Sequence, residues 1–436
     1  MVPGMKETHP KKYPSLVYAN EGGEIIDLPD LAMAGRSGRS FRLPELSELI
    51  PLPEGSELFM LPDRVPVGID PLSGHPVALK CDPGGSGRIA AVAAFMAPAY
   101  TSLYTAAFQK EGRDARVLPL FAYSAVGWLN GRFWVAAFRA DPDERQDAGN
   151  FDVRIIRSRT RRMLKRYSEN RLVRHLGHCC LTYGCPAARN YFMGRWEAPL
   201  PTSPACNASC VGCISLQPSG CCPSTQDRIS FVPTPEEIAG VALPHIRRAE
   251  RPVVSFGQGC EGEPLMQAAT IEKAIRLIRR ATSRGTINLN SNASMPDRIE
   301  RLACAGLDSV RVSLSSAQKR HYTLYYRPMG YAFDDVLESI RVMKRKGRFV
   351  SLNYFILPGV TDDPAEAAAF HDLVEDCRPD FIQLRNLNMD PDWYLSVIRY
   401  RRRSEPAGIG RWLADLKCAF PWLRFGYFNP YLGKDA

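Results

Sequence analysis

The sequence predicts an α/β protein in which a β-rich N-terminal domain precedes a partial (β/α)6 barrel. Three observations lead to this fold class. From about residue 190, apolar strand-like runs alternate with amphipathic helical segments, as a parallel βα repeat requires. Before residue 150, apolar runs are short and separated by Pro and Gly, and Asn130-Gly131 marks a tight hairpin turn. The length of 436 residues exceeds that of one ordinary domain, so a barrel with an additional domain is expected.

Changes in composition place the expected boundaries. We expect four parts: a β-rich domain of unknown role (1–150), a basic helical connector (151–189), the partial barrel (190–390) and a C-terminal extension (391–436). The strand-like runs of the first part are 58–61, 65–69, 77–80 and 117–122. In the connector, apolar residues from Ile156 to Val173 roughly follow one helical stripe.

The barrel is expected to begin with a strand that runs into Cys206. Five helix–strand units follow, with helices at 234–248, 270–284, 296–305, 333–346 and 364–377, and strands at 252–256, 286–290, 309–314, 349–357 and 381–384. Active sites of parallel βα folds lie at the carboxyl ends of the strands. The segments that directly follow these strands are therefore where functional residues are expected.

The distribution of cysteines indicates metal binding in a reducing compartment. Nine of the thirteen cysteines lie between Cys179 and Cys260. The first residues are polar and lysine-rich, and the longest apolar run, residues 89–98, is too short to span a bilayer. We therefore expect a cytoplasmic protein without a membrane partner. In that compartment, clustered cysteines are metal ligands or catalytic thiols rather than disulfides.

The net charge of +10 is concentrated in the connector. Nine Lys and Arg residues and one Glu lie between Arg154 and Arg174, and a smaller basic run lies between Arg399 and Arg403. Either the connector presents a solvated helix face, or it binds nucleic acid or another anionic partner. The sequence contains no recognised RNA-binding module, so nucleic acid is the less favoured partner.

Three cysteines follow the first expected strand in the pattern Cys206-Asn-Ala-Ser-Cys210-Val-Gly-Cys213. Three thiolates on one loop can hold three irons of a cubane cluster, whereas a zinc site normally shows four ligands in paired Cys-x2-Cys arrangements. The pattern resembles the Cys-x3-Cys-x2-Cys hallmark of the radical S-adenosylmethionine (radical SAM) superfamily, over about residues 195–390. The resemblance implies a 4Fe–4S cluster on these cysteines and S-adenosylmethionine (SAM) as the second cofactor. One departure is Gly212, where the family usually carries an aromatic residue.

Segments after the next two strands resemble those with which the superfamily binds SAM. Gly262-Glu263-Pro264 is similar to the family's Gly-Gly-Glu-Pro element, so Glu263 or a neighbouring backbone carbonyl is the candidate contact for the amino group of SAM. Ser291 and Asn292 match an element that approaches the ribose or methionine in the family. The same two residues can instead form an Asx turn that opens the next helix.

The fourth and fifth strands complete the expected cofactor site. Residues 311–315 resemble an Arg-Val-Ser-Leu-Asp element of relatives that modify peptides or build the molybdenum cofactor, and the resemblance directs Ser313 toward the cofactor. Arg327 lies in a stretch similar to the one that follows in those relatives and is a candidate contact for a carboxylate. Ile356 and Leu357 match the apolar pair that packs on adenine in the family.

The remaining cysteines suggest an auxiliary iron–sulfur cluster as an additional cofactor. The candidate ligands near the main motif are Cys179, Cys180, Cys185, Cys221 and Cys222. The region after residue 390 holds only Cys418, so it lacks the Cys-rich C-terminal domain of many peptide-modifying relatives. Cys260 is either a redox thiol near the cofactor or a buried bystander.

The resemblance implies a reaction but identifies neither a substrate nor a catalytic residue. Reductive cleavage of SAM generates a 5′-deoxyadenosyl radical, which modifies a peptide or small metabolite, with a reductant such as flavodoxin or ferredoxin as partner. Gln383, Arg385 and Asn388, near the end of the sixth strand, either line the substrate pocket or are turn residues. Two alternatives stay open: an RNA-modifying enzyme of the same superfamily, and a nonenzymatic iron–sulfur interaction protein.

Overall fold

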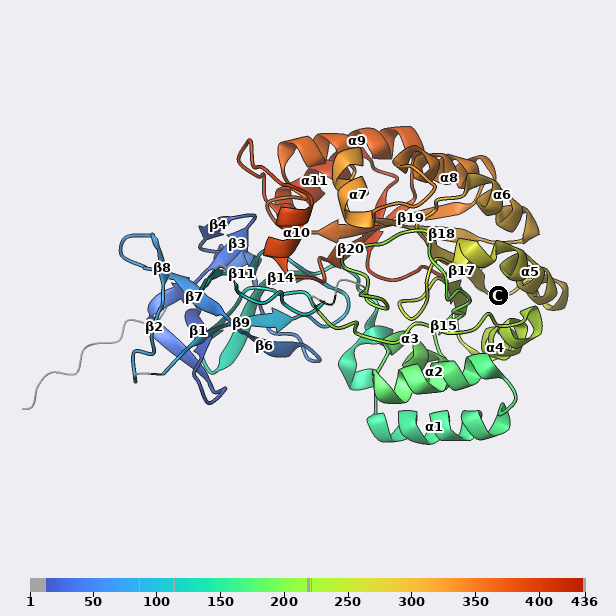
Figure 1. The fold of residues 1–436 in the computed structure, drawn as a ribbon, viewed down its shortest axis with the longest axis horizontal. Helices are drawn as coiled ribbons and strands as arrows, with labels where there is room; N and C mark the ends of the chain where they lie inside the picture. The colour runs from blue at the N-terminus through green and yellow to red at the C-terminus, as the bar shows by residue number, and fades with distance from the viewer. Residues whose placement is uncertain (1–12, 86, 113, 218–219, 221, 434–436) are drawn as a thin grey trace, which may run out of the picture.

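The computed structural model describes residues 13–85, 87–112, 114–217, 220 and 222–433. Its two main parts lie side by side in Figure 1, with the β-rich N-terminal domain in blue and the barrel in green to red. The helices of the connector lie along one side of the barrel. The predicted fold class, a partial α/β barrel preceded by a β-rich region, is confirmed.

Antiparallel strands build the N-terminal domain. Within the described residues, the larger sheet has eleven strands, with the main path β10-β14-β13-β1-β2-β7-β12, and β11-β3-β4 form a smaller sheet. Asn130 and Gly131, with φ values of 50° and 79°, join β13 to β14 in the expected tight hairpin. The strands are β1 (Ser15–Ala19), β2 (Ile25–Met33), β3 (Gly35–Ser37), β4 (Ser40–Arg42), β5 (Leu49–Pro51), β6 (Glu57–Leu61), β7 (Arg64–Ile69), β8 (Pro76–Ala78), β9 (Ala90–Phe95), β10 (Tyr100–Ser102), β11 (Thr105–Ala106), β12 (Phe108–Lys110), β13 (Val126–Leu129) and β14 (Arg132–Arg139).

One strand expected in this domain does not form. Residues 117–122 have no strand structure. Pro119 in their centre has no amide hydrogen for a ladder, and the amide of Leu118 donates to the carboxylate of Asp390, in the barrel, at 3.1 Å. This segment therefore contributes to the contact between the two parts of the chain instead of to a sheet.

The connector consists of α1 (Val153–Arg166), α2 (Arg171–Thr182) and α3 (Pro186–Met193). The helical stripe expected from residue 156 to 173 is interrupted between the first two. Asn170 caps α2, because its side chain accepts a hydrogen bond from the amide of Val173 at 3.1 Å. Ile156 and Val173 are both buried, so the two helices present their apolar faces to the same core.

A single parallel sheet, in the order β15-β16-β17-β18-β19-β20-β21, forms the partial barrel within the described residues. Its strands are β15 (Glu197–Pro199), β16 (Val253–Phe256), β17 (Thr286–Ser291), β18 (Ser309–Leu314), β19 (Phe349–Ile356), β20 (Phe381–Asn386) and β21 (Arg424–Gly426). Helices cover the outer face of the sheet (Figure 1). The helices between its strands are α4 (Pro235–Arg248), α5 (Ala268–Ala281), α6 (Pro296–Ala305), α7 (Lys319–Tyr326), α8 (Phe333–Arg345), α9 (Pro364–Cys377), α10 (Pro391–Val397) and α11 (Ile409–Ala419). None of the helices in the described parts of the chain combines the length and the hydrophobicity that a membrane-spanning helix needs.

The two edges of this sheet differ from the expectation. The first strand ends at Pro199, seven residues before Cys206, because Pro201 and Pro204 cannot donate ladder hydrogen bonds. At the other edge, β21 pairs with β20 and adds a seventh parallel strand that was not predicted. The chain after β21 then turns into the barrel interior, where Asn429 donates to Glu197 at 2.8 Å and accepts from Gln383 at 2.8 Å.

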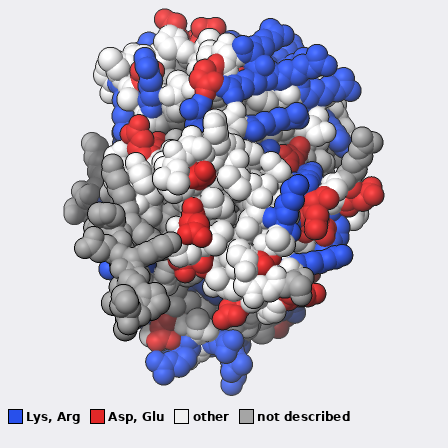
Figure 2. All heavy atoms as spheres, turned by 90° about the vertical axis from the view of Figure 1, so that its left-hand side faces the viewer, with Lys and Arg blue, Asp and Glu red and all other residues white. Residues whose placement is uncertain are grey.

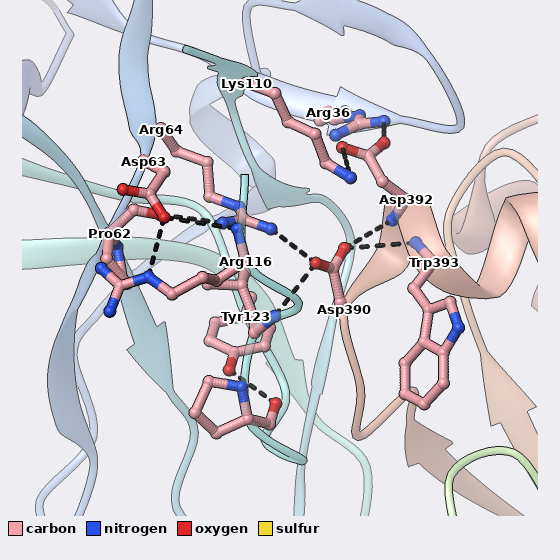
Figure 3. Close-up of polar contacts among 12 residues, drawn as sticks. Arg36, Pro62, Asp63, Arg64, Lys110, Arg116, Tyr123, Asp390, Asp392 and Trp393 are labelled. Atoms are coloured by element: carbon pink, nitrogen blue, oxygen red, sulfur yellow. Dashed lines mark hydrogen bonds and ion pairs between the residues drawn. The ribbon is translucent and has the colours of Figure 1, made fainter. Parts of the chain in front are cut away.

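The N-terminal domain contacts the barrel at the carboxyl ends of β19 and β20. The amide of Gly38 donates to the carbonyl of Pro358, just after β19, at 2.7 Å. Arg64 and Asp390, which follows β20, form a fully buried ion pair of 2.6 Å (Figure 3). Since the carboxyl ends of the strands carry the active sites of parallel βα folds, the N-terminal domain lies beside the functional edge of the barrel.

A buried histidine in α4 predicts how stability depends on pH. Nε2 of His245 donates to the carbonyl of Trp196 at 3.1 Å, and burial lowers the pKa of His245 to about 4. In the unfolded chain the pKa of histidine is about 6.5. Between these values the unfolded chain binds a proton that the folded chain excludes, so the free energy of unfolding falls as the pH falls from 6.5 toward 4.

Replacing His245 by glutamine should remove this dependence, because glutamine cannot be protonated. Between pH 7 and pH 5, the free energy of unfolding of His245→Gln should fall by about 2 kcal/mol less than that of the wild type. Urea titrations at the two pH values measure this difference. His75→Gln, a change at an exposed histidine, is the control and should follow the wild type; equal losses in all three proteins would contradict the prediction.

Candidate metal centre and cofactor site

The loop that carries Cys206, Cys210 and Cys213 is tied to the segment that follows β16. The amide of Gly262 donates to the carbonyl of Ser203 at 2.7 Å. The amide of Glu263 donates to the carbonyl of Ala205 at 2.9 Å. A Cβ atom on Gly262 would overlap this carbonyl, so glycine is required where the two segments cross.

Helix α7 holds the other side of the same loop. The amides of Ser209 and Val211 donate to the carbonyls of Tyr326 and Tyr325 at 3.1 and 3.0 Å. Just beyond α7, the amide of Met329 donates to the carbonyl of Asn207 at 2.9 Å. The cysteine loop is therefore fixed by backbone contacts from two elements that are more than fifty residues away in the sequence.

The electrostatics of the three thiols fit a cationic metal cluster. Burial raises the pKa of Cys210 well above its usual value, and the neighbouring Cys206 and Cys213 raise it further. The guanidinium of Arg228 lies 3.4 Å from the Sγ atom of Cys213. Three neighbouring thiolates in a partly buried site need positive charge nearby to stay ionised, and iron bound to them supplies it. The residues present therefore fit a 4Fe–4S cluster.

Gly212, the departure from the family pattern, is explained by a contact from α7. A Cβ atom on Gly212 would lie 2.7 Å from the hydroxyl of Tyr325. Tyr325 is buried, and the ring centroid of Phe355 lies 5.5 Å from its own. The aromatic group that relatives carry within the motif is thus supplied here by another helix, and glycine leaves room for it.

Glu263 joins the ends of β16 and β17. Its carboxylate accepts hydrogen bonds from the hydroxyl of Ser291 at 2.6 Å, the amide of Asn292 at 2.8 Å and the amide of Leu265 at 3.0 Å. Burial raises the pKa of Glu263 to about 7. Pro264, also buried, begins a short 3-10 helix directly after it. Because the carboxylate of Glu263 accepts from these three donors, it positions the segment that follows β16.

Asn292 forms the Asx turn offered as one of its two interpretations, and its role toward SAM stays a prediction. Its side-chain oxygen accepts from the amide of Ser294 at 3.1 Å, which is the contact of an Asx turn. Its side-chain nitrogen donates to the side-chain oxygen of Asn207, in the cysteine loop, at 2.8 Å. The structure therefore brings Ser291, Asn292, Glu263 and the cysteine loop together in one network.

The other predicted cofactor residues lie on later strands and at the end of α7. Ser313 is half-buried in β18 and pairs with Asn353 of β19. Ile356 and Leu357 are buried at the carboxyl end of β19. Arg327 follows α7 and has an exposed side chain. The roles predicted for these residues toward SAM stay predictions.

Glu366 was not predicted, yet it organises the loop after β18. Its carboxylate accepts from the hydroxyls of Ser316 and Tyr354, both at 2.6 Å, and from the amide of Ala317 at 2.6 Å. Burial opposes its ionisation, but these donors and His321 outweigh it and lower the pKa of Glu366. The sequence signal that could have identified Glu366 is that it is the single acid on the buried face of the Ala-rich helix α9.

Two arginine side chains lie inside the barrel: Arg385, one of the candidates for the substrate pocket, and Arg311, to which the sequence assigned no role. Arg311 and Arg385 donate to the same acceptor, the side-chain oxygen of Gln383, at 3.2 and 3.4 Å. Within the described residues, the Nε atoms of both arginines are buried and lack a hydrogen-bond partner. Burial and the charge of Arg385 lower the pKa of Arg311 to about 9. The carboxylate of Glu197 acts in the opposite direction on Arg311, and the guanidinium of Arg385 lies over the ring of Tyr427, 3.9 Å from its centroid.

Of the cysteines proposed for an auxiliary cluster, Cys179, Cys180 and Cys185 lie near one another, since the charges of Cys179 and Cys180 raise the pKa of Cys185. Cys221 lies outside the described residues. Cys180 contacts the hydroxyl of Thr160 at 3.5 Å. Cys179 instead lies beside Cys260, and hydrogen bonding to Cys260 lowers the pKa of Cys179 to about 5. An auxiliary cluster on the five predicted cysteines is not confirmed.

Comparisons with known proteins agree with the cysteine motif. The family described as "Radical SAM superfamily" matches residues 200–371. FeMo cofactor biosynthesis protein NifB of Klebsiella pneumoniae is 25% identical over 177 residues, which are 37% of this chain and 37% of that protein. Probable dual-specificity RNA methyltransferase RlmN of Synechococcus sp. (strain JA-2-3B'a(2-13)) is 30% identical over 145 residues, 32% of this chain and 41% of that protein. The chain therefore spans less than half the length of these curated relatives.

Solved structures of similar proteins include the FeFe-hydrogenase maturase HydG of Carboxydothermus hydrogenoformans. It aligns with a TM-score of 0.38 and 13% identity, over 62% of this chain and 69% of that one. Methylornithine synthase (PylB) aligns with a TM-score of 0.37 and 15% identity, over 62% and 76% of the two chains. The motif and the family match identify residues 200–371 as a radical SAM domain.

Proposed function

We propose that this chain holds a 4Fe–4S cluster on Cys206, Cys210 and Cys213, cleaves SAM reductively and modifies a peptide or small metabolite. A radical SAM domain implies a 4Fe–4S cluster and SAM in general; their place on these residues and the substrate class are the proposal. The observation that carries it is the network through Glu263 and Asn292, which ties the cysteine loop to the carboxyl ends of β16 and β17.

When bound, the cluster and SAM supply a one-electron cleavage that yields methionine and a 5′-deoxyadenosyl radical, which abstracts a hydrogen atom from the substrate. The residues of the chain hold the loop and exclude water. Tyr325 packs against Phe355 and Tyr394, with ring centroids 5.5 and 5.7 Å apart, beside the cysteine loop. Such an apolar wall protects a reactive intermediate from solvent. The electron comes from a reductant such as flavodoxin or ferredoxin.

The two buried arginines of the barrel interior, Arg311 and Arg385, support an anionic substrate. Arg311 lies two residues before Ser313 on the same face of β18, and Arg385 lies near the carboxyl end of β20. Guanidinium groups bind carboxylates through paired hydrogen bonds, and the Nε atoms of both arginines are available donors. A carboxylate on the peptide or metabolite is the group we propose they recognise, with Arg327 meeting it or SAM from outside.

The test is anaerobic production of 5′-deoxyadenosine. The full chain is reconstituted with iron and sulfide, reduced with dithionite and given SAM, and the nucleoside is measured by chromatography. We expect product from the wild type and none above background from the Cys206/Cys210/Cys213→Ala variant. A variant with Cys304 and Cys418 replaced by alanine is the control, because both thiols are exposed and lie outside the motif. Equal product from the two variants would reject the proposed ligands.

RNA modification is a second candidate, and the charge of α1 favours it. Arg157, Arg161 and Arg162 are exposed on this helix. Figure 2, which shows the face of the N-terminal domain, has basic side chains gathered at its upper and lower ends and few over the middle. One curated relative, RlmN, is named as an RNA methyltransferase. An RNA partner would therefore contact the connector rather than the centre of the N-terminal domain.

Salt-dependent binding separates this candidate from the first. If α1 binds RNA, replacing Arg157, Arg161 and Arg162 by glutamine should weaken binding of a labelled stem-loop RNA and reduce the slope of log affinity against log salt by about 2. The control replaces three exposed basic residues of α4 and α5, Arg247, Lys273 and Arg280. Equal effects in both variants would show only nonspecific attraction and would remove the RNA candidate.

A further inference from the structure

We infer that His175, Cys179 and Cys260 form a second metal site, which binds one zinc ion between α2 and the loop after β16. Within the described residues, these three form the group of His, Cys, Asp and Glu side chains whose ligand atoms all lie within 4.8 Å of one another. The site uses none of the three cysteines of the radical SAM motif. It therefore stands independently of the proposed function.

The distances fit a single tetrahedral ion. Zinc lies at about 2.3 Å from thiolate sulfur and about 2.0–2.1 Å from histidine nitrogen, so a sulfur and a nitrogen on one tetrahedral zinc are about 3.6 Å apart. Nε2 of His175 lies 3.6 Å from Sγ of Cys179. The two residues are four positions apart on α2, which places them on one face of the helix.

The surroundings of the three side chains favour a metal ion with nitrogen and sulfur ligands over bound water. Cys179 is 1% exposed and Cys260 is 3% exposed, so both thiols are withdrawn from water. The ring of Phe231 packs edge-on against His175, with centroids 6.4 Å apart. Two thiols and an imidazole in a site withdrawn from solvent are the donors that zinc prefers. The backbone also brings Cys185 close to α2, since its amide donates to the carbonyl of Cys179 at 3.1 Å.

The contrast with the radical SAM motif supports one ion rather than a cluster. The Sγ atoms of Cys206, Cys210 and Cys213 do not all lie within 4.8 Å of one another. In a cubane cluster each thiolate binds a different iron, so the thiolates are spread apart. The compact spacing at His175, Cys179 and Cys260 leaves no room for several irons between the ligands.

An ion at this position would fix the connector to the cofactor site. Cys260 lies two residues before Gly262, the residue that crosses the cysteine loop. The carbonyl of Cys260 also accepts from the amide of Ile229 at 2.8 Å. Zinc bound to α2 and Cys260 would hold this segment in place from the side opposite to the cysteine loop.

Metal content of the full chain tests the inference. The experiment uses the Cys206/Cys210/Cys213→Ala variant, so that zinc cannot occupy the radical SAM motif. After loading with zinc and gel filtration, we expect about one zinc ion per chain by mass spectrometry. Adding Cys179→Ser or Cys260→Ser should reduce zinc at least about tenfold. Cys180→Ser is the matched control, because Cys180 is the buried neighbour of Cys179 on the same helix and should keep the zinc.

A second measurement does not depend on how the variants fold. Cobalt loaded into the same background protein should show thiolate-to-cobalt charge-transfer absorption, which zinc displaces. Background protein that binds neither zinc nor cobalt overturns the inference. So does zinc retained by a folded Cys179→Ser variant, or binding of several irons with sulfide in the background protein.

Discussion

Replacing Asp390 by asparagine is expected to lower the free energy of unfolding by about 3–5 kcal/mol, because the buried Arg64 guanidinium loses its counter-charge. Both side chains are 0% exposed, and Nη2 of Arg64 lies 2.6 Å from Oδ2 of Asp390 (Figure 3). The other partners are neutral, since Arg64 donates to the carbonyl of Pro62 at 2.8 Å and Asp390 accepts from the amide of Leu118 at 3.1 Å. Asparagine keeps an oxygen that can cap α10, but its amide nitrogen replaces the oxygen that accepts from Arg64 and Leu118, so the change removes the charge and these two acceptor contacts together.

The double substitution Arg64→Met with Asp390→Asn is the control. It removes both charges and leaves no unpaired ion, so it should be more stable than Asp390→Asn by at least about 1 kcal/mol. Urea unfolding of the full chain, followed by tryptophan fluorescence, measures both values. A loss of less than about 1 kcal/mol for Asp390→Asn would show that water reaches the Arg64 guanidinium and that the pair contributes as a surface ion pair does.

This ion pair also bears on whether residues 1–150 form a separable domain. Deleting them would leave Asp390 without Arg64 and would expose the segment after β20. Ser102 would no longer donate to Asn386, in the same edge of the barrel, at 2.8 Å. Contacts of this kind, between parts of the chain that are far apart in sequence, argue that the barrel edge depends on the N-terminal domain for its packing.

Most of the barrel could be predicted because its signals are local. Residues 296–305 and 364–377 form helices with the expected bounds, since each begins with a proline at its first position and one of them has an aspartate cap. Residues 309–314 form the expected strand. The errors lie where the tertiary structure decides: at 117–122, where Leu118 bonds to the barrel, and at the short first strand, where successive prolines end the ladder.

In the candidate site, too, the sequence predicts the local features and only the folded chain shows the contacts between distant segments. The spacing of the cysteines and the Gly262-Glu263-Pro264 segment are visible in the sequence, because each lies within a few residues. The contact of Tyr325 with Gly212, and that of Cys260 with Cys179, join segments separated by about eighty to more than one hundred residues. No periodicity or spacing connects such pairs, so only the folded chain shows that α7 covers the cysteine loop and that α2 faces Cys260.

Replacing Gly262 by alanine is expected to reduce bound iron and the rate of 5′-deoxyadenosine formation by about 10- to 100-fold. The added Cβ would overlap the backbone carbonyl of Ala205, directly before Cys206. A backbone atom cannot rotate away as a flexible side chain can, so the cysteine loop must move. Overpacking of this kind costs about 1–3 kcal/mol, and each 1.4 kcal/mol or so corresponds to a tenfold change. Iron content and product formation, both measured after anaerobic reconstitution, test the prediction.

Gly410→Ala is the matched control, because a Cβ atom at Gly410 would meet nothing within 4 Å. Gly410 lies inside α11, where alanine should leave iron binding unchanged and stabilise the helix by up to about 1 kcal/mol. If Gly262→Ala keeps its iron but loses product, the segment acts on SAM rather than on the cysteine loop. If it keeps both, the carbonyl of Ala205 and the segment after β16 can separate without moving the ligands, and the close crossing is not what holds the centre.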